Sequence, residues 1–148
     1  EYYAALEAYR GHEVRHEGAV SSAFQRLLEV TARKHDWHLV PKQSTTVRGK
    51  QIIPDGTLRD DFNLHRGYWE AKDSADKLDV EIKKKIARGY PLTNTIFEDT
   101  RTAVLYQNGV QVEPRFLNCY SRPFGWRLAS NSRILYTCTL FRGAIDAF

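Results

Sequence analysis

The hydrophobic residues of this chain change their spacing along the sequence, from the period of a helix to the alternation of a strand and back. A stretch over 17–34 carries apolar residues at steps of three and four and predicts a helix with one buried face. The same spacing returns over 76–88 and predicts a second helix, which Gly89 and Pro91 end. Strand-like runs lie between and after these segments. The sequence therefore predicts an α/β domain in which helices cover a sheet.

The predicted strands are short and are bounded by turn-forming residues. We expect strands over 37–40, 52–58, 67–72, 103–107 and 110–112, a loop or edge hairpin over 41–50, and a further short helix over 2–9. The second strand must bend or end near Pro54, because proline has no N–H to donate to a neighbouring strand. Asn108-Gly109 predicts a tight hairpin, since both residues accept the positive φ angles of a type I′ turn. The first long helix is expected to pack on Ile53, Leu58, Trp69 and Val104.

Composition narrows the class of protein. With 148 residues, of which 42% are hydrophobic and 27% charged, the chain is long enough for one globular core. No apolar run reaches the roughly 18 residues of a transmembrane helix, and the first residues lack the basic flank and apolar stretch of a signal peptide, so we expect a cytoplasmic protein. Cys119 and Cys138 are too few for a disulfide scaffold, which fits a reducing compartment. Because the sequence holds no methionine, we expect it to be part of a longer protein.

The residues that carry chemistry lie around the second and third predicted strands. Glu70 and Lys72 are separated by one residue, so on a strand their side chains share one face. Asp55 follows Pro54, where pairing of the two strands would bring its carboxylate close to Glu70. Two carboxylates suit Mg²⁺, which keeps several waters and takes further ligands from substrate phosphates. With Lys72 beside the ion to hold a water, these groups support phosphodiester hydrolysis.

Longer segments of the sequence resemble a known nuclease family. The similar segments are Glu17-Gly18-Ala19, Ala23-Phe24-Gln25-Arg26-Leu27-Leu28, Trp37-His38-Leu39-Val40-Pro41, Ile53-Pro54-Asp55-Gly56-Thr57-Leu58, Gly67-Tyr68-Trp69-Glu70-Ala71-Lys72-Asp73 and Lys85-Ile86-Ala87-Arg88-Gly89-Tyr90-Pro91. Together they resemble the Mrr-like PD-(D/E)xK nuclease domain, in particular the one at the N-terminus of type ISP restriction-modification enzymes. The resemblance covers about residues 15–112. It implies a restriction-endonuclease-like core, with a central mixed sheet flanked by helices in the order αβββαβ.

The resemblance also implies a site and a substrate. Asp55 and Glu70 would bind Mg²⁺, and Lys72 would position or activate the attacking water. Glu17 would lie near the metal or orient Lys72. From the residues alone, Glu17 lies on the inward stripe of its helix, where an unpartnered carboxylate is costly, and a first-turn glutamate favoured by the helix dipole is the alternative. The implied function is a site-specific deoxyribonuclease domain that cuts double-stranded DNA in a Mg²⁺-dependent reaction.

Domain boundaries and partners follow from the same resemblance. We expect the nuclease domain to occupy 1–112, and 113–148 to hold the end of the last strand and an atypical tail. Helicase, methyltransferase and target-recognition domains accompany the nuclease in that family. This sequence carries neither a phosphate-binding loop nor an Asn-Pro-Pro-Tyr motif. The net charge is +4, and most of the excess lies after residue 112, so net charge alone does not predict DNA binding.

Individual basic residues lead to narrower expectations. Arg48, Lys50 and Arg66, placed in polar loops near the site, are expected to contact DNA phosphates, with ordinary solvated bases as the alternative. The run Lys83-Lys84-Lys85 is predicted to form a solvent-exposed face, with Glu81 paired to Lys85.

Two other classes of function stay open at this point. The segment His12-Glu13-Val14-Arg15-His16 matches H-E-x-x-H, which on a helix would make a zinc metallohydrolase with Glu13 as general base. Gly11 and Gly18 interrupt that helix, and no third ligand follows convincingly. The other class is a DNA-binding or docking module that keeps the nuclease fold without cutting. The presence of both carboxylates and the lysine in the predicted site favours the nuclease.

Overall fold

The computed structural model describes residues 17–73, 75, 77–99, 101–112 and 115–116, and of 17–21 and 115–116 it describes the backbone alone. The helices are α2 (Glu17–Ala32) and α3 (Leu78–Ala87), with a 3-10 turn η1 (Arg33–His35). The strands are β1 (Trp37–Pro41), β2 (Thr45–Val47), β3 (Lys50–Ile52), β4 (Gly56–Asp60), β5 (His65–Ala71), β6 (Asn94–Glu98), β7 (Thr102–Gln107), β8 (Val110–Gln111) and β9 (Arg115–Phe116). The predicted helix over 2–9, the H-E-x-x-H segment at 12–16 and most of the predicted tail lie outside the described residues.

The main sheet is mixed. Its strand order is β1-β4-β5-β6-β7-β8, with β9 alongside β7, while β2 and β3 form a separate hairpin. The strands β5 and β6 run parallel, and the other neighbours in the sheet are antiparallel. The parallel pair is connected through α3, because parallel strands need a long crossover. The expected α/β core, a central mixed sheet flanked by helices, is therefore confirmed. Apart from the β2–β3 hairpin, its first elements follow the order αβββαβ as α2, β1, β4, β5, α3 and β6, of which β6 is a strand that the sequence did not predict.

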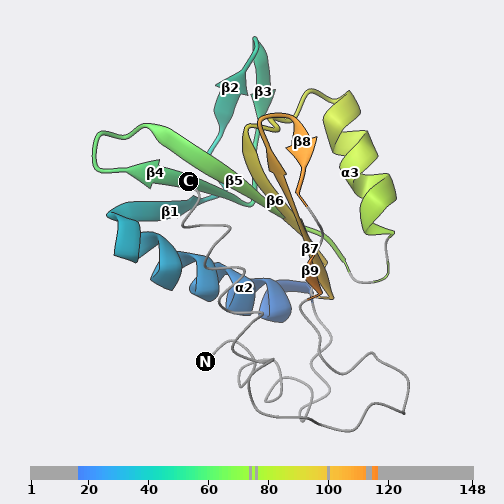
Figure 1. Ribbon diagram of the computed structural model, residues 1–148, viewed down its shortest axis with the longest axis horizontal. Helices are drawn as coiled ribbons and strands as arrows, with labels where there is room; N and C mark the ends of the chain where they lie inside the picture. The colour runs from blue at the N-terminus through green and yellow to red at the C-terminus, as the bar shows by residue number, and fades with distance from the viewer. Residues whose placement is uncertain (1–16, 74, 76, 100, 113–114, 117–148) are drawn as a thin grey trace, which may run out of the picture.

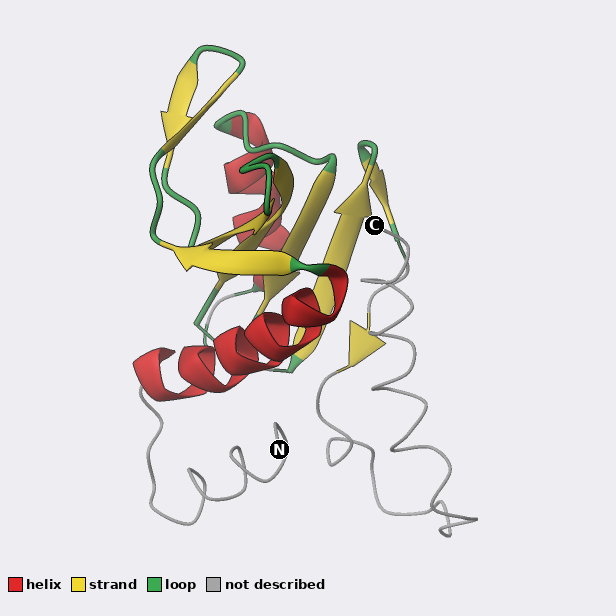
Figure 2. Ribbon diagram, turned by 90° about the vertical axis from the view of Figure 1, so that its left-hand side faces the viewer, coloured by secondary structure: helices red, strands yellow, loops and turns green. Residues whose placement is uncertain are grey.

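The two helices cover opposite faces of this sheet (Figures 1 and 2). On one face, Phe24 and Leu28 of α2 pack against Trp69. On the other face, Leu78 and Ile82 of α3 pack in a second cluster that includes Phe97. Among the described residues, no helix is long and apolar enough to cross a membrane.

The residues on which α2 was predicted to pack are confirmed in part. Trp69 and Leu58 are buried as expected. Val104 belongs to the α3 side instead, because its neighbours in β7 point toward α2 and successive side chains of a strand alternate between faces. Ile53 is exposed, since β3 ends at Ile52 and the chain runs through a short connection before β4 begins.

Residues with positive φ angles form the turns between several elements. Asp36 adopts a left-handed conformation with φ of 57°, which ends the helical segment and starts β1. Asn108 and Gly109, with φ of 50° and 83°, form the predicted hairpin turn. The predicted loop or edge hairpin over 41–50 contains β2 and the turn into β3. The ends of most predicted elements agree closely with the structure, but the predicted strand over 52–58 is divided, since residue 52 ends β3 and residues 56–58 begin β4.

The strand β6 was not predicted, although it lies inside the sheet. Four of its five residues are buried, and consecutive side chains pack on opposite faces. A strand that is covered on both sides lacks the polar and apolar alternation by which half-buried strands are recognised. Its position beside β5 fixes the strand that carries Glu70.

Gly56 begins β4 in a space that excludes a side chain. A Cβ at this position would lie 2.7 Å from Leu39 Cδ1 and 2.9 Å from Trp69 Cε3. The tip of Leu39 can rotate, but Trp69 is buried against Phe24. We therefore expect Gly56→Ala to lower the free energy of unfolding in urea by about 1–3 kcal/mol, whereas the exposed Thr46→Ala should change it by less than about 0.5 kcal/mol. Equal stability of the two variants would contradict the tight packing.

Candidate active site

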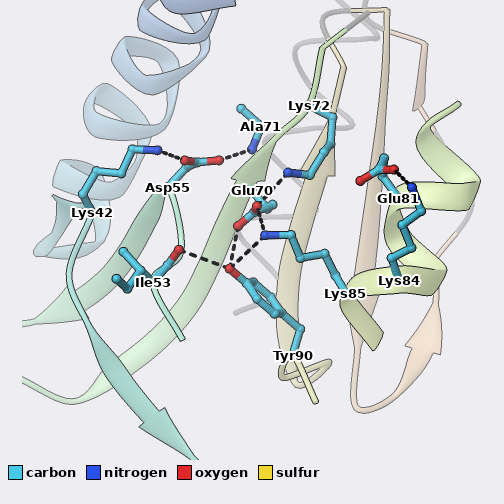
Figure 3. A network of polar contacts seen from close by, with 10 residues as sticks. All are labelled: Lys42, Ile53, Asp55, Glu70, Ala71, Lys72, Glu81, Lys84, Lys85 and Tyr90. Atoms are coloured by element: carbon cyan, nitrogen blue, oxygen red, sulfur yellow. Dashed lines mark hydrogen bonds and ion pairs between the residues drawn. The ribbon is translucent and has the colours of Figure 1, made fainter. Parts of the chain in front are cut away.

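The pairing of β4 with β5 brings the predicted carboxylates together. Gly56 lies opposite Trp69 in the antiparallel register, so the preceding residue, Asp55, lies next to the end of β5. The Asp55 side chain is fixed there, because its Oδ2 accepts a hydrogen bond of 2.8 Å from the Ala71 N–H (Figure 3). Asp55 and Glu70 are therefore neighbours across the two strands.

Glu70 and Lys72 share the face of the sheet that α3 covers. The Lys72 N–H donates to the Glu98 carbonyl at 2.7 Å, so the extended chain continues past the end of β5. Lys72 Nζ donates to Glu70 Oε1 at 2.8 Å. Glu70 is almost completely buried, and a buried carboxylate requires such partners to remain charged without a large desolvation cost.

Lys85 of α3 is a second lysine on Glu70, and its predicted exposure is wrong. Its ammonium forms an ion pair with Glu70 Oε1, and its side chain is only 18% exposed. The neighbouring Lys84 is 57% exposed and is the residue that pairs with Glu81, at 2.5 Å. Lys85 follows Leu78 by seven residues, which places it on the inward stripe of the helix. That position was the signal that distinguished it from the other lysines of the run.

Tyr90 completes the contacts of Glu70 and was not singled out by the sequence analysis. Its hydroxyl donates to Glu70 Oε2 at 2.8 Å and lies 3.2 Å from the Ile53 carbonyl. Burial raises the pKa of the Tyr90 hydroxyl well above its ordinary value, and the negative charges of Glu70 and Asp55 raise it further. Tyr90 therefore stays protonated and keeps donating to the carboxylate.

Lys42 pairs with Asp55 and was also not predicted. It follows β1, and its Nζ donates to Asp55 Oδ1. Its backbone N–H also donates to the Asp55 carbonyl at 3.1 Å, so both a backbone and a side-chain contact join the two chain segments. The Lys42 side chain is 72% exposed, which leaves its ammonium largely in solvent.

The other predicted site residues are Glu17, Arg48, Lys50 and Arg66. Glu17 begins α2, and its side chain lies outside the described residues. Arg48 and Lys50 lie in the β2–β3 hairpin, and the stem of Lys50 lies near Gly89. Arg66 lies in β5 rather than in the predicted loop, because the strand begins at His65. Its side chain donates to Asp60 Oδ2 at 2.9 Å and 2.6 Å.

The donor set fits Mg²⁺. Asp55 and Glu70 offer hard oxygen ligands, and Mg²⁺ needs only one or two protein carboxylates when waters and phosphates supply the rest. Within the described residues, no group of three or more His, Cys, Asp or Glu residues gathers as a metal site, so a closed protein cage is not built there. Three ammonium groups face the two carboxylates, which leaves the cluster with excess positive charge. An anionic substrate would offset this charge.

Comparison with known proteins gives matches among solved structures. No family model matches the chain, and no curated protein matches it. A cryo-electron microscopy structure of DrdV in complex with DNA matches 95% of this chain at 38% identity and a TM-score of 0.76. The chain spans 13% of that DrdV chain. A candidate nuclease of the DUF820 group from Anabaena variabilis ATCC 29413 matches at 10% identity and a TM-score of 0.47, covering 84% of this chain and 80% of that one. The chain is thus similar in sequence and structure to one segment of DrdV.

Proposed function

We propose that this chain is a Mg²⁺-dependent DNA endonuclease domain of a larger restriction-modification enzyme. The observation that carries the proposal is the meeting of Asp55, Glu70 and Lys72 at one end of the β4–β5 pair. The similarity to DrdV, solved in complex with DNA, supports DNA as the substrate. The chain spans 13% of DrdV, so further domains of such an enzyme would lie outside this segment. The resemblance described above implies helicase, methyltransferase and target-recognition domains as these partners.

Each residue of the cluster has a part in the proposed reaction. Asp55 and Glu70 would hold Mg²⁺, which when bound supplies positive charge to the phosphate and a more acidic water. Lys72 lies beside Glu70, with its side chain 16% exposed, and its ammonium would hold the attacking water and offset the charge that develops on the phosphate. Tyr90 fixes the orientation of Glu70 before substrate arrives. The Mg²⁺-dependent hydrolysis of a phosphodiester is therefore the reaction that these groups support best.

The nicking of a supercoiled plasmid at low salt tests this function. We expect nicking in Mg²⁺ and none in EDTA, and we expect Lys72→Met to lower the rate by about 10²-fold because it removes a positioned cation. Lys84→Met is the matched control, since Lys84 pairs with the more exposed Glu81 and should keep the parent rate. Cleavage in EDTA, or equal rates for the two variants, would contradict the proposal. A folded parent that binds DNA without cutting it in Mg²⁺ would favour the non-cutting module.

A further inference from the structure

Both carboxylates of the candidate site carry a lysine that the proposed reaction does not use. Lys42 comes from the end of β1 and contacts Asp55. Lys85 comes from α3, on the other side of the cluster, and contacts Glu70 (Figure 3). These two ammonium groups are additional to Lys72, and they reach the site from two separate parts of the fold.

Every oxygen of the two carboxylates already accepts a contact. Asp55 Oδ1 accepts from Lys42 and Oδ2 from the Ala71 N–H. Glu70 Oε1 faces two ammonium groups, and Oε2 accepts from Tyr90. The two ammonium groups fill both acceptor positions of Glu70 Oε1, so a divalent cation that binds this oxygen must displace a lysine. A cation that binds Asp55 Oδ1 meets the repulsion of the Lys42 ammonium on the same oxygen. The backbone and tyrosine donors are less able to leave, because the sheet and the buried ring hold them in place.

Each lysine can adopt another position when a cation displaces it. Lys42 is largely in solvent, so its flexible stem can turn away without breaking the core. Lys85 has a second partner, since its Nζ lies 3.4 Å from the Tyr90 hydroxyl and 4.5 Å from the centre of the Tyr90 ring. Displacement from Glu70 therefore leaves Lys85 close to the site.

Charge decides when such a displacement is favourable. A divalent cation placed beside three ammonium groups meets repulsion from all of them. A DNA phosphate reduces that repulsion, and its oxygens accept hydrogen bonds from the displaced lysines. Each ligand thus makes the binding of the other more favourable, which is the definition of a positive coupling between two sites.

We propose that Lys42 and Lys85 are positioning residues that occupy Asp55 and Glu70 in the free protein and thereby couple divalent-cation binding to DNA binding. The inference rests on the proposed nuclease function and adds a control of metal occupancy to it. In the absence of DNA, the lysines keep the carboxylates oriented and the cation weakly bound. When DNA is present, the same lysines move to its phosphates and the cation binds tightly.

Calorimetric titration with Ca²⁺, which takes the same oxygen ligands as Mg²⁺, measures this coupling directly. We expect a short DNA duplex to tighten Ca²⁺ binding to the parent by about tenfold or more, within the usual range of couplings. Lys85→Met should tighten Ca²⁺ binding without DNA by about tenfold, because the competing ammonium is gone while the apolar stem remains. Lys85→Met should also reduce the effect of DNA. Lys84→Met, from the same turn of α3, should match the parent in both titrations.

The possible outcomes separate the inference from the function on which it rests. Ca²⁺ affinity without DNA that is equal in Lys85→Met and Lys84→Met, or weaker in Lys85→Met, would overturn the role of Lys85. Lys42→Met gives a second test that does not depend on a buried position, and it should also tighten Ca²⁺ binding without DNA. A parent that binds no Ca²⁺ even with DNA would contradict the proposed metal site itself. A thermal melt of each variant confirms that all four proteins are folded.

Discussion

Asp55→Asn is expected to remove nearly all cleavage while leaving the domain folded. The asparagine oxygen can still accept the hydrogen bond from the Ala71 N–H, so the link between β4 and β5 is kept. The substitution removes the negative charge that would bind the cation, and the new amide group faces Lys42, whose exposed ammonium can turn away. We expect the nicking rate to fall by about 10³-fold, equivalent to about 4 kcal/mol of transition-state stabilisation.

The control for this change is Asp61→Asn. Asp61 is a surface aspartate that pairs with His38 at 3.0 Å, at the opposite end of β4 from the site. Its substitution should leave both the nicking rate and the melting temperature close to those of the parent. If Asp55→Asn cut at more than about a tenth of the parent rate, a difference of about 1.4 kcal/mol, Asp55 would not be a metal ligand.

Phe97→Ala is expected to cause the largest loss of stability. Phe97 is 0% exposed in β6, lies opposite Glu70 in the parallel register, and packs against the rings of Tyr90 and Tyr106. Its truncation would leave a cavity between the sheet and α3, which such a rigid and doubly covered strand cannot close. We expect the free energy of unfolding in urea to fall by about 3–5 kcal/mol.

Phe62 offers a matched control for this truncation. It is the same residue type, but it is 84% exposed, in the turn between β4 and β5. Phe62→Ala should change the free energy of unfolding by less than about 0.5 kcal/mol. A loss of under about 1 kcal/mol for Phe97→Ala would mean that the β6 side of the core can repack, contrary to the burial described above.

The helices and turns were predictable because their signals are local. The spacing of apolar residues in α2 and α3, and the backbone freedom of Asn108-Gly109, depend on residues close together in the sequence. The strand β6 gave no such signal, because a strand packed on both faces has no polar side. Its identity depends on α2 and α3 covering the sheet, which is a property of the whole fold.

The candidate site likewise contains residues with a local sequence signal and residues without one. Glu70 and Lys72 share a face by strand period, and Asp55 could be placed beside them once the two strands were paired. The inward position of Lys85 was available from the spacing of its helix, but a run of three lysines favoured a solvent-exposed interpretation. Lys42 and Tyr90 lie in connections without periodicity. Their contacts arise from segments that meet only in the folded chain.

The parallel pairing of β5 with β6 has a consequence for when this site can exist during folding. The residues around Glu70 are contributed by segments on both sides of the α3 crossover, and Tyr90 reaches the carboxylate only after that helix has packed. Non-local pairings of this kind form slowly, because the chain must close a long loop before any contact is made. During synthesis, a chain that ends before β6 holds both carboxylates and Lys72 but lacks the strand that supports them. We therefore expect the assembled cluster to form late in folding, once β6 has paired with β5 and supports the strand that carries Glu70.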